Sequence, residues 1–560
     1  MDMRKSVLMM TGTEDMVESF VPFDYEAARD NFSLEICEDF NFAFDVVAER
    51  SATKDKNALI TLDKNGNPTA NFTYSDLDRL SSQFANALMR LGANKGDLAL
   101  VMIPRVVEWY QVLLGCMKIG VVTIPSTNLL TAKDIEYRVN RAEARMLIVT
   151  AEHAEKVEQI KANCPSLENF IIIGPPRDGW ISLETMCEVE QDTVCRERLP
   201  KTFSHELMLI YFTSGTTRNP KMVGRDHAYA LAHSITRDYW MDLRDDDVHW
   251  TLTDTGWAKA AWGLMYPPLL AGSTVILFDG KGFDAQLHLE IIENQKVTTF
   301  CAPPTVYRAF SQMDLSDIDF SSLRHCFGAG EPLNPEAMRS WKNATGCEIY
   351  DGYGQTETIN IVANFPGMEI RPGSMGKPVP GLNVNIIDDE GNVMAADEVG
   401  HIGVKITDPW PLGLFHGYFR DDDVTAEAFR NGWYYTGDTA TRDVDGYIWF
   451  VGRSDDIISS ASYRISPFEV ESALVEHEAV LESAVVGKPD QLRGEIVMAY
   501  ITLAPGFEPS ESLAKDIQEF VKRQTAPYKY PRKIAFRSNL PKTISGKIRR
   551  VELREEAAQS

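Results

Sequence analysis

The stretch YFTSGTTRNPK at residues 211–221 carries the side chains that a phosphate-binding loop requires. Its hydroxyl groups can donate hydrogen bonds, its glycine allows close backbone approach to a ligand, and its lysine supplies positive charge. It differs from the common nucleoside-triphosphate loop, because Pro220 stands five places after Gly215 and Met222 follows Lys221. The stretch therefore predicts a phosphate site of another kind.

Five further segments combine glycines with acidic, basic or hydroxyl side chains. Each of them alone is weak evidence, since YGQTE, for example, could be an ordinary turn into a helix. The segments are FGAGEP (327–332), DGYGQTE (351–357), YYTGD (434–438), GRSDDIISSASYRISPFEVE (452–471) and PKTISGKIRR (541–550).

Short apolar runs alternate with amphipathic stretches through the first two thirds of the chain. Apolar strands separated by helices predict parallel sheets with both faces covered, which is the α/β class. The expected strands are 147–150, 170–174, 207–212, 274–278 and 298–303, and the expected helices include 287–295 and 334–344.

The pattern changes twice toward the C-terminus. Paired strands around a turn, as in VNIIDDEGNV (384–393), predict an antiparallel β subdomain at about 373–450. After the GRSDD sequence, two helices, two strands and a basic tail predict a compact α+β unit. We therefore expect a multidomain protein with a large N-terminal domain (1–454), which includes the subdomain, and a small C-terminal domain (455–560).

Composition limits the kinds of partner. The chain has 560 residues with 56 basic and 81 acidic side chains, and its net charge of -25 argues against binding to nucleic acid and against stable membrane insertion. Eight scattered cysteines form no C-x-x-C pair, so neither a disulfide framework nor a zinc site is predicted. The acidic N-terminal stretch does not resemble a presequence, which favours a cytoplasmic protein, either a monomer or a homodimer.

In their order and spacing, the six segments closely resemble the adenylate-forming superfamily of acyl-CoA synthetases, firefly luciferase and peptide-synthetase adenylation domains. The likeness covers nearly the whole chain from Phe72 onward. The segments DTGWAKAAWG (254–263), APPTVYR (302–308) and TAPYKYPRKI (525–534) are most similar to medium-chain acyl-CoA synthetases. In that family a carboxylate attacks ATP to give an acyl-AMP and pyrophosphate, and the thiol of coenzyme A then displaces AMP.

The resemblance implies a nucleotide site with several parts. The opening loop would hold the departing phosphates, Tyr353 would stack on adenine unless it is a core aromatic, and Asp438 would bind the ribose unless it is a surface turn residue. Lys221 would support the loop or a phosphate. The implied ATP- and AMP-binding residues are Thr213, Ser214, Gly215, Thr216, Thr217, Lys221, Gly330, Glu331, Pro332, Asp351, Gly352, Tyr353, Gly354, Gln355, Thr356, Asp438, Arg453 and Lys547.

Three residues are implied to act directly in the first half-reaction. Lys547 would bridge the incoming carboxylate and the α-phosphate, which lowers their repulsion and stabilises the transition state. Thr356 would donate to the α-phosphate, and Glu357 would offer Mg²⁺ one hard oxygen ligand. The co-substrates expected from the family are therefore ATP with Mg²⁺, a small carboxylic acid and coenzyme A.

The resemblance also implies that the small C-terminal domain is a mobile lid. The second half-reaction would need Lys547 to leave, by rotation of this lid about Asp455. The loop presented to coenzyme A would then consist of Ser460, Ala461, Ser462, Tyr463 and Arg464. Two residues depart from the family pattern, since Ser462 and Arg218 stand where glycine is usual. Ser462 makes the thioester step less secure than adenylation.

The acyl pocket would be bounded by tryptophans, whose bulk favours short or branched acids over long chains. Lys259 is either a lysine that reaches solvent or a charge near the tunnel. The expected pocket residues are Trp240, Trp257, Lys259, Trp262 and Gly328.

We therefore expect an AMP-forming acid-thiol ligase, an acyl-CoA synthetase for a short- to medium-chain acid, straight or branched. Alternatives are an enzyme that adenylates an aryl or amino acid, a luciferase-like oxygenase, and a nucleotide-binding regulator of the same fold without turnover. The regulator is suggested only by Arg218 and Ser462, and the presence of Lys547, Glu357 and Asp438 argues against it.

Overall fold

The computed structural model describes residues 23–213, 220–280, 282–330, 335–460, 463–543 and 547–559. The chain divides into two compact units. The first is built from the described residues up to Thr213, from Met222–Leu382 and from Thr407–Thr425. The second consists mainly of Asn383–Ile406 and the chain from Ala426 onward.

The first unit contains a seven-stranded sheet that is parallel except for one edge strand, β9. Helices α5 and α6 pack on one face of it through Ile135, Val139 and Val157, all of which are fully buried. The strand order is β7 (Ile181–Ser182), β6 (Asn169–Ile173), β5 (Met146–Thr150), β3 (Leu98–Met102), β4 (Val122–Pro125), β8 (Leu207–Phe212) and β9 (Met222–Asp226). Its neighbouring helices are α3 (Tyr74–Arg90), α4 (Val107–Ile119), α5 (Ala132–Ala142), α6 (Ala154–Glu158) and α7 (Leu183–Glu188).

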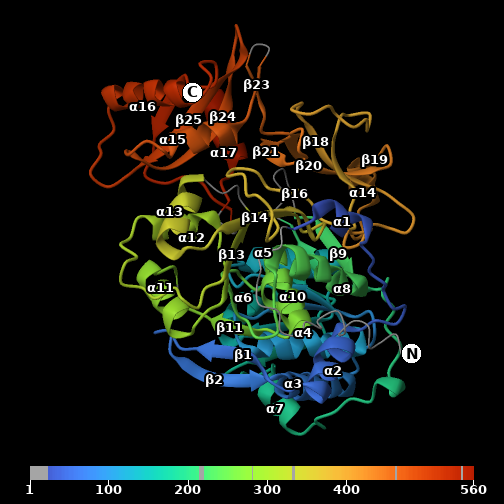
Figure 1. The fold of residues 1–560 in the computed structure, drawn as a ribbon. Coiled ribbons are helices and arrows are strands. Elements are labelled where there is room, and N and C mark those ends of the chain that lie inside the picture. The colour runs from blue at the N-terminus through green and yellow to red at the C-terminus, as the bar shows by residue number, and fades with distance from the viewer. Residues whose placement is uncertain are drawn as a thin grey trace. The chain divides into compact units, whose positions relative to one another are not determined.

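The same unit contains a nine-stranded sheet with a parallel centre. Its order is β16 (Lys377–Pro378), β15 (Asn360–Ala363), β14 (Ile349–Gly354), β13 (His325–Ala329), β12 (Thr299–Cys301), β10 (Val248–Thr251), β11 (Thr274–Phe278), β1 (Asn57–Leu62) and β2 (Pro68–Thr73). Helices α11 (Ala285–Asn294), α12 (Pro304–Ser311) and α13 (Pro335–Thr345) lie together on one side of it (Figure 1). Buried aromatic side chains such as Trp250, Phe300 and Trp341 fill the space between them.

Shorter helical pieces complete this unit. They are α1 (Tyr25–Asp30), α2 (Glu49–Thr53), α8 (His227–Ile235), η7 (Thr236–Met241), α9 (Ala258–Ala260), η8 (Ala261–Met265) and α10 (Tyr266–Ala271), and α14 (Asp422–Ala428) follows Asp421. Together the two sheets and their helices confirm the expected α/β class.

The second unit contains two sheets. The antiparallel one consists of β17 (Val384–Ile387), β18 (Gly400–Lys405), β20 (Trp433–Arg442), β19 (Phe429–Arg430) and β21 (Ile448–Arg453). The C-terminal one consists of β22 (Ile458–Ser460), β23 (Tyr463–Ile465), β24 (Val480–Asp490), β25 (Gly494–Leu503) and β26 (Lys533–Phe536).

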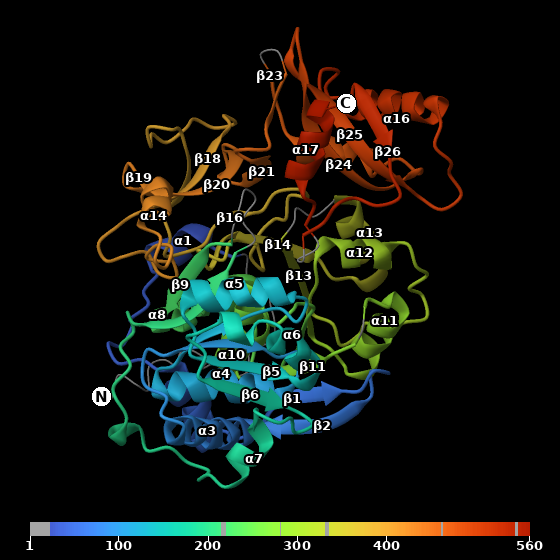
Figure 2. The same ribbon diagram turned by 180° about the vertical axis from the view of Figure 1, so that it is seen from behind.

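Helices cover both faces of the C-terminal sheet (Figure 2). Val485 faces a core with α15 (Pro467–Leu474) and α16 (Glu511–Gln524), whereas Ala484 and Val486 face α17 (Arg550–Gln559). Alternate residues of a strand point to opposite faces, so one strand serves two small cores. This is the α+β unit that the sequence predicts, whereas its boundary at residue 455 and its role as a mobile lid stay predictions.

No helix among the described residues is both long enough and apolar enough to cross a membrane.

Candidate active site

The carboxyl ends of two neighbouring parallel strands bring the predicted adenine-binding residues together. In the register of β13 and β14, Gly328 lies opposite Asp351 and Ala329 lies opposite Gly352, so Gly330 follows at the same edge. Ligands commonly bind at the carboxyl edge of such sheets. Glu331 and Pro332, which were predicted for the same wall, lie outside the described residues.

A tryptophan lies directly behind this edge. A Cβ atom added to Gly352 would lie 2.5 Å from Cε2 of Trp240, so only glycine fits there. Trp240 is fully buried, and its indole Nε1 donates to the carbonyl of Tyr350 at 3.1 Å. His325 holds the backbone of Trp240 through its ring Nε2, 2.8 Å from the carbonyl. Because burial lowers the pKa of His325 to about 4, this ring is neutral at pH 7.

The YGQTE turn connects β14 to β15, and its last residue, Glu357, is held by three others. The backbone carbonyl of Glu357 accepts hydrogen bonds from Arg225 Nη1 at 2.7 Å and from the amide of Phe415 at 2.9 Å. The hydroxyl of Tyr418 donates to Oε1 of the Glu357 carboxylate at 2.9 Å. Arg225 is only 2% exposed. The carboxylate of Glu357 is therefore fixed in direction although it remains partly accessible to solvent.

The chemistry of Glu357 fits a magnesium ion that is bound mainly through phosphate. No group of three or more His, Cys, Asp or Glu side chains in the described part of the chain is arranged to hold a metal. Mg²⁺ in nucleotide sites commonly takes one or two carboxylates and completes its shell with phosphate and water. A single oriented carboxylate is compatible with that requirement.

The predicted phosphate loop joins β8 to β9, which pair as antiparallel neighbours from Leu207–Asp226 to Phe212–Met222. Thr213 and Lys221 at its two ends are partly buried. Ser214, Gly215, Thr216 and Thr217 lie outside the described residues, as does Arg218.

In the second unit, the predicted ribose-binding residues face each other across β20 and β21. Asp438 is paired with Arg453 in the register, and Arg453 Nη1 lies 3.2 Å from Oδ1 of Asp438. The Asp438 side chain is 7% exposed, which argues against an ordinary surface turn residue. The buried carboxylate has a charge partner and a fixed position.

Lys547 lies on a short hairpin near the C-terminus, and its side chain is exposed. Thr543 and Lys547 exchange hydrogen bonds, from the amide of Thr543 to the carbonyl of Lys547 at 2.7 Å and from the amide of Lys547 to Thr543 Oγ1 at 3.1 Å. Asp455 follows β21, and its carbonyl accepts from Arg554 at 3.3 Å.

The predicted coenzyme A loop connects β22 to β23. Ser460 is buried, and Tyr463 is 49% exposed with its ring stacked on Tyr528 at 4.1 Å. Ala461, Ser462 and the side chain of Arg464 lie outside what the structure describes.

The predicted acyl residues differ in their surroundings. Trp262 is partly buried and packs edge-on against Trp240 at 5.1 Å. The ammonium of Lys259 lies 5.5 Å from the centroid of the Trp262 ring. Burial raises the pKa of Cys301, and the charge of Lys259 opposes this rise. Lys259 is therefore partly buried beside the Trp262 ring. Trp257 is the N-cap residue of α9, and Gly328 lies within β13.

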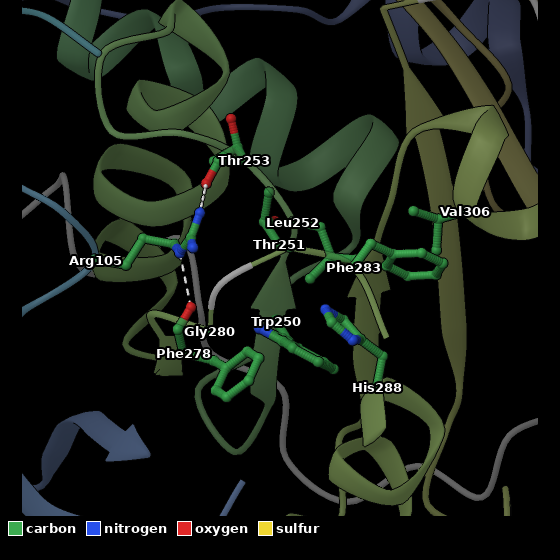
Figure 3. Close-up of a pocket in the computed structure, with 11 residues that line it drawn as sticks. Arg105, Trp250, Thr251, Leu252, Thr253, Phe278, Gly280, Phe283, His288 and Val306 are labelled. Atoms are coloured by element: carbon green, nitrogen blue, oxygen red, sulfur yellow. Dashed lines mark hydrogen bonds between the residues drawn. The ribbon is translucent and has the colours of Figure 1, made fainter. Parts of the chain in front are cut away.

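A cavity of about 210 Å³ opens beside β10 and β11 (Figure 3). Arg105 lies at one side of it and donates to the carbonyls of Phe278 and Thr253, while Trp250, Phe283 and His288 form the opposite side. None of the five predicted acyl residues lines this cavity. His249, next to Trp250 in the strand, instead stacks on Phe327 beside Trp240. The cavity and the tryptophan pair thus lie on opposite faces of β10.

Comparison with known protein families shows which family the chain belongs to. The pattern of the AMP-binding enzyme family matches residues 46–419, and that of the AMP-binding enzyme C-terminal domain matches residues 469–547. The chain belongs to the AMP-binding enzyme family. The two matched ranges include the YGQTE turn and extend to Lys547.

Individual relatives of this AMP-binding enzyme narrow the class. It is 43% identical to the mitochondrial acyl-coenzyme A synthetase ACSM3 of Rattus norvegicus, over 95% of this chain and 93% of the relative. It is 42% identical to the mitochondrial acyl-coenzyme A synthetase ACSM5 of Homo sapiens, over 92% and 90%. The crystal structure of the anthranilate CoA ligase AuaEII with anthranoyl-AMP matches with a TM-score of 0.85 at 33% identity, covering 94% of this chain and 98% of that one.

These relatives confirm the expected AMP-forming acyl-CoA synthetase of the medium-chain type, and with it the use of ATP and coenzyme A. They also correct one expectation. A cytoplasmic location is wrong, because the matching relatives are mitochondrial enzymes and point to the mitochondrion. The expectation had relied on the composition of about the first twenty residues, which carries far less information than a match along nearly the whole chain.

Sequence reasoning missed three side chains of this AMP-binding enzyme that hold other residues in place. Arg225 and Tyr418 hold the predicted site residue Glu357, and Glu471 pairs with Arg550, the first residue of α17. Arg225 and Tyr418 belong to none of the quoted family segments. A buried arginine within the strand MVGRD (222–226) is nevertheless unusual and could have been noticed. Glu471 ends the quoted segment ISPFEVE and could have been singled out as an acidic residue on the apolar face of a helix.

Proposed function

We propose that this AMP-binding enzyme activates short- to medium-chain carboxylic acids, straight or branched, and that Trp262 limits their length. The observation that supports this is the partly buried Trp262 indole, which packs against the fully buried Trp240. A side chain that is not itself part of the core can form the end of a pocket. Lys259 lies over the same ring, so the end of the pocket is polar on one side.

In the first half-reaction, a carboxylate oxygen of the acid attacks the α-phosphorus of ATP. A new P–O bond forms, the bond to the β-phosphate oxygen breaks, and pyrophosphate leaves with that electron pair. No general base is needed, because the acid is already ionised at pH 7. We assign charge neutralisation at the α-phosphate to Lys547, hydrogen bonding to Thr356, and ribose binding to Asp438 with Arg453.

Mg²⁺, when bound with ATP, would neutralise phosphate charge, and Glu357 is the residue that would hold it. In the second half-reaction, the sulfur of coenzyme A forms a bond to the acyl carbonyl carbon and the thiol proton is released to water. The C–O bond to AMP breaks, and AMP leaves with that electron pair. We assign the pivot of the lid rotation to Asp455. We assign the contact with the incoming thiol of coenzyme A to the segment from Ser460 to Arg464.

The proposed substrate class is tested by pyrophosphate exchange across a straight-chain and branched acid series. We expect kcat/KM to rise by roughly fourfold per added methylene, since each buried CH₂ contributes about 0.8 kcal/mol. The rise should end abruptly while the chain is still short or medium. A broad optimum that extends to long-chain acids would contradict the proposal, and so would a preference for amino acids.

Replacing Trp262 with glycine should shift the preferred acid to longer chains. The indole would no longer occupy the end of the pocket, and the cavity left behind would lower stability. The measurement is kcat/KM across the same acid series. Trp180→Gly is a matched control, because Trp180 packs on Phe170 in the other sheet and should affect stability without changing the preference. An unchanged preference in folded Trp262→Gly would place the end of the pocket at other residues.

Replacing Tyr418 with phenylalanine should weaken the binding of Mg²⁺. The ring remains, but the hydroxyl that fixes the Glu357 carboxylate is lost, and a hydrogen bond to a charged group contributes about 1.5–3 kcal/mol. We expect a higher Mg²⁺ concentration for half-maximal pyrophosphate exchange, and weaker Mn²⁺ binding by paramagnetic resonance in the presence of a non-hydrolysable ATP analogue. Tyr307→Phe, which loses a buried hydroxyl that donates to Phe327, should change stability only. Equal metal dependence in both variants would contradict the role of Tyr418.

A further inference from the structure

The hairpin that carries Lys547 is tied together at its base. Lys542 and Ile548 form a β-bridge, and the amide of Arg549 donates to the carbonyl of Pro541 at 2.9 Å. The hairpin leads directly into α17, which starts at Arg550. The position of Lys547 therefore depends on how the start of α17 is held.

Arg550 is held by a buried carboxylate on another helix. Its Nη2 lies 2.9 Å from Oε1 and 2.7 Å from Oε2 of Glu471 in α15. Glu471 is 9% exposed, and its Oε1 also accepts from the amide of Val485 in β24 at 2.7 Å. An ion pair that is also anchored to the sheet backbone fixes direction as well as distance.

The same helix contacts the chain just after β21. Arg554, one turn after Arg550, pairs with Oδ1 of Asp456 and donates to the carbonyl of Asp455 at 3.3 Å. Arg550 Nη1 also lies 3.9 Å from Oδ2 of Asp456. The Asp456 side chain is 13% exposed. Two arginines on one face of α17 thus connect the Lys547 hairpin to the residues at and after the predicted pivot.

We propose that Glu471 is a positioning residue that acts through Arg550 to place Lys547 for adenylation, and that Arg550 and Arg554 make the hairpin move as one body with Asp456. This inference rests on the proposed role of Lys547. Only two residues, Ile548 and Arg549, lie between Lys547 and Arg550, so a change at the anchor is transmitted to the ammonium. A displacement of about 1 Å in a reacting geometry can lower a rate on the order of a hundredfold.

The test compares Glu471→Gln and Arg550→Lys with wild type. Arg550→Lys keeps the charge but loses the two-pronged contact. We expect both to lower the kcat of pyrophosphate exchange by at least about tenfold, to leave thioester formation from supplied acyl-AMP within about twofold, and to speed amide hydrogen exchange in a peptide covering Lys547 to Arg550. Glu469→Gln is the matched control, since Glu469 lies on the same helix and pairs with Lys529 instead. It should resemble wild type in all three measurements.

A second variant distinguishes loss of folding from loss of the positioning of Lys547. Glu471→Met combined with Arg550→Met leaves no unpaired charge, although the buried amide of Val485 loses its acceptor. We therefore expect this variant to fold with a somewhat lower unfolding temperature and still to show slow pyrophosphate exchange with normal thioester formation. Pyrophosphate exchange at the wild-type rate in that folded double variant would overturn the inference, as would equal loss of both half-reactions. Lys547→Ala is measured in parallel, because normal exchange in that variant would refute the role of Lys547 itself, whatever the anchor variants do.

Discussion

Replacing Lys547 with alanine is expected to lower the rate of acyl-AMP formation from ATP and acid on the order of a hundredfold or more, because an oriented charge at the α-phosphate contributes about 3 kcal/mol to the transition state. Thioester formation from supplied acyl-AMP should remain close to wild type, since the lysine serves only the first half-reaction. The two rates are measured separately, by pyrophosphate exchange and by release of AMP on addition of coenzyme A.

Lys542→Ala provides the matched control for this expectation. Lys542 belongs to the same hairpin, and its ammonium pairs with Glu482 at 2.7 Å with both side chains partly exposed. An exposed pair of this kind contributes about 0–1 kcal/mol, so both half-reactions should be nearly unchanged. Equal loss of both half-reactions in Lys547→Ala would contradict the assignment.

Replacing Asp455 with proline is expected to separate the half-reactions in the opposite direction. Proline fixes φ near −65°, and forcing it into another conformation costs about 3 kcal/mol, so thioester formation should fall on the order of a hundredfold while adenylation survives. Within the described residues the amide of Asp455 donates no hydrogen bond, so the substitution removes none. The measurement is coenzyme A consumption against pyrophosphate exchange.

Asp455→Ala keeps the backbone free and should resemble wild type in both assays. If folded Asp455→Pro forms thioester at the wild-type rate, then rotation is the wrong mechanism or Asp455 is the wrong pivot. The arginine contacts from α17 would in that case mark a rigid joint rather than a moving one.

The local elements could be predicted from the sequence because their signals are local. The run expected at 147–150 is β5 (Met146–Thr150), and the helix expected at 287–295 is α11 (Ala285–Asn294), which starts earlier because Asp284 caps it. In VNIIDDEGNV the second expected strand is only a bridge between Ile387 and Val393. There the Asp388 side chain accepts from the amide of Asn392 and closes the turn.

The contacts that orient the site residues could not be predicted in this way. Tyr418 and Glu357 are 61 residues apart, and Arg550 and Glu471 are 79 apart. Periodicity reports which face of an element is buried, but it does not report which distant side chain meets it. The family motifs supply the residues that would touch the substrates, whereas the residues that hold them emerge only from the fold.

Trp240 is shared by two parts of the site, and this restricts how the substrate range can change during evolution. Its indole lies against Gly352 and also packs edge-on against Trp262. A smaller residue at position 240 would lengthen the acyl pocket that we propose but would also release the strand expected to line the adenine slot. A smaller residue at position 262 would also lengthen the proposed pocket, but it would leave that strand in place. Paralogues that diverge toward longer acids should therefore change position 262 first, and a change at 240 should persist only where a second substitution refills the space behind Gly352.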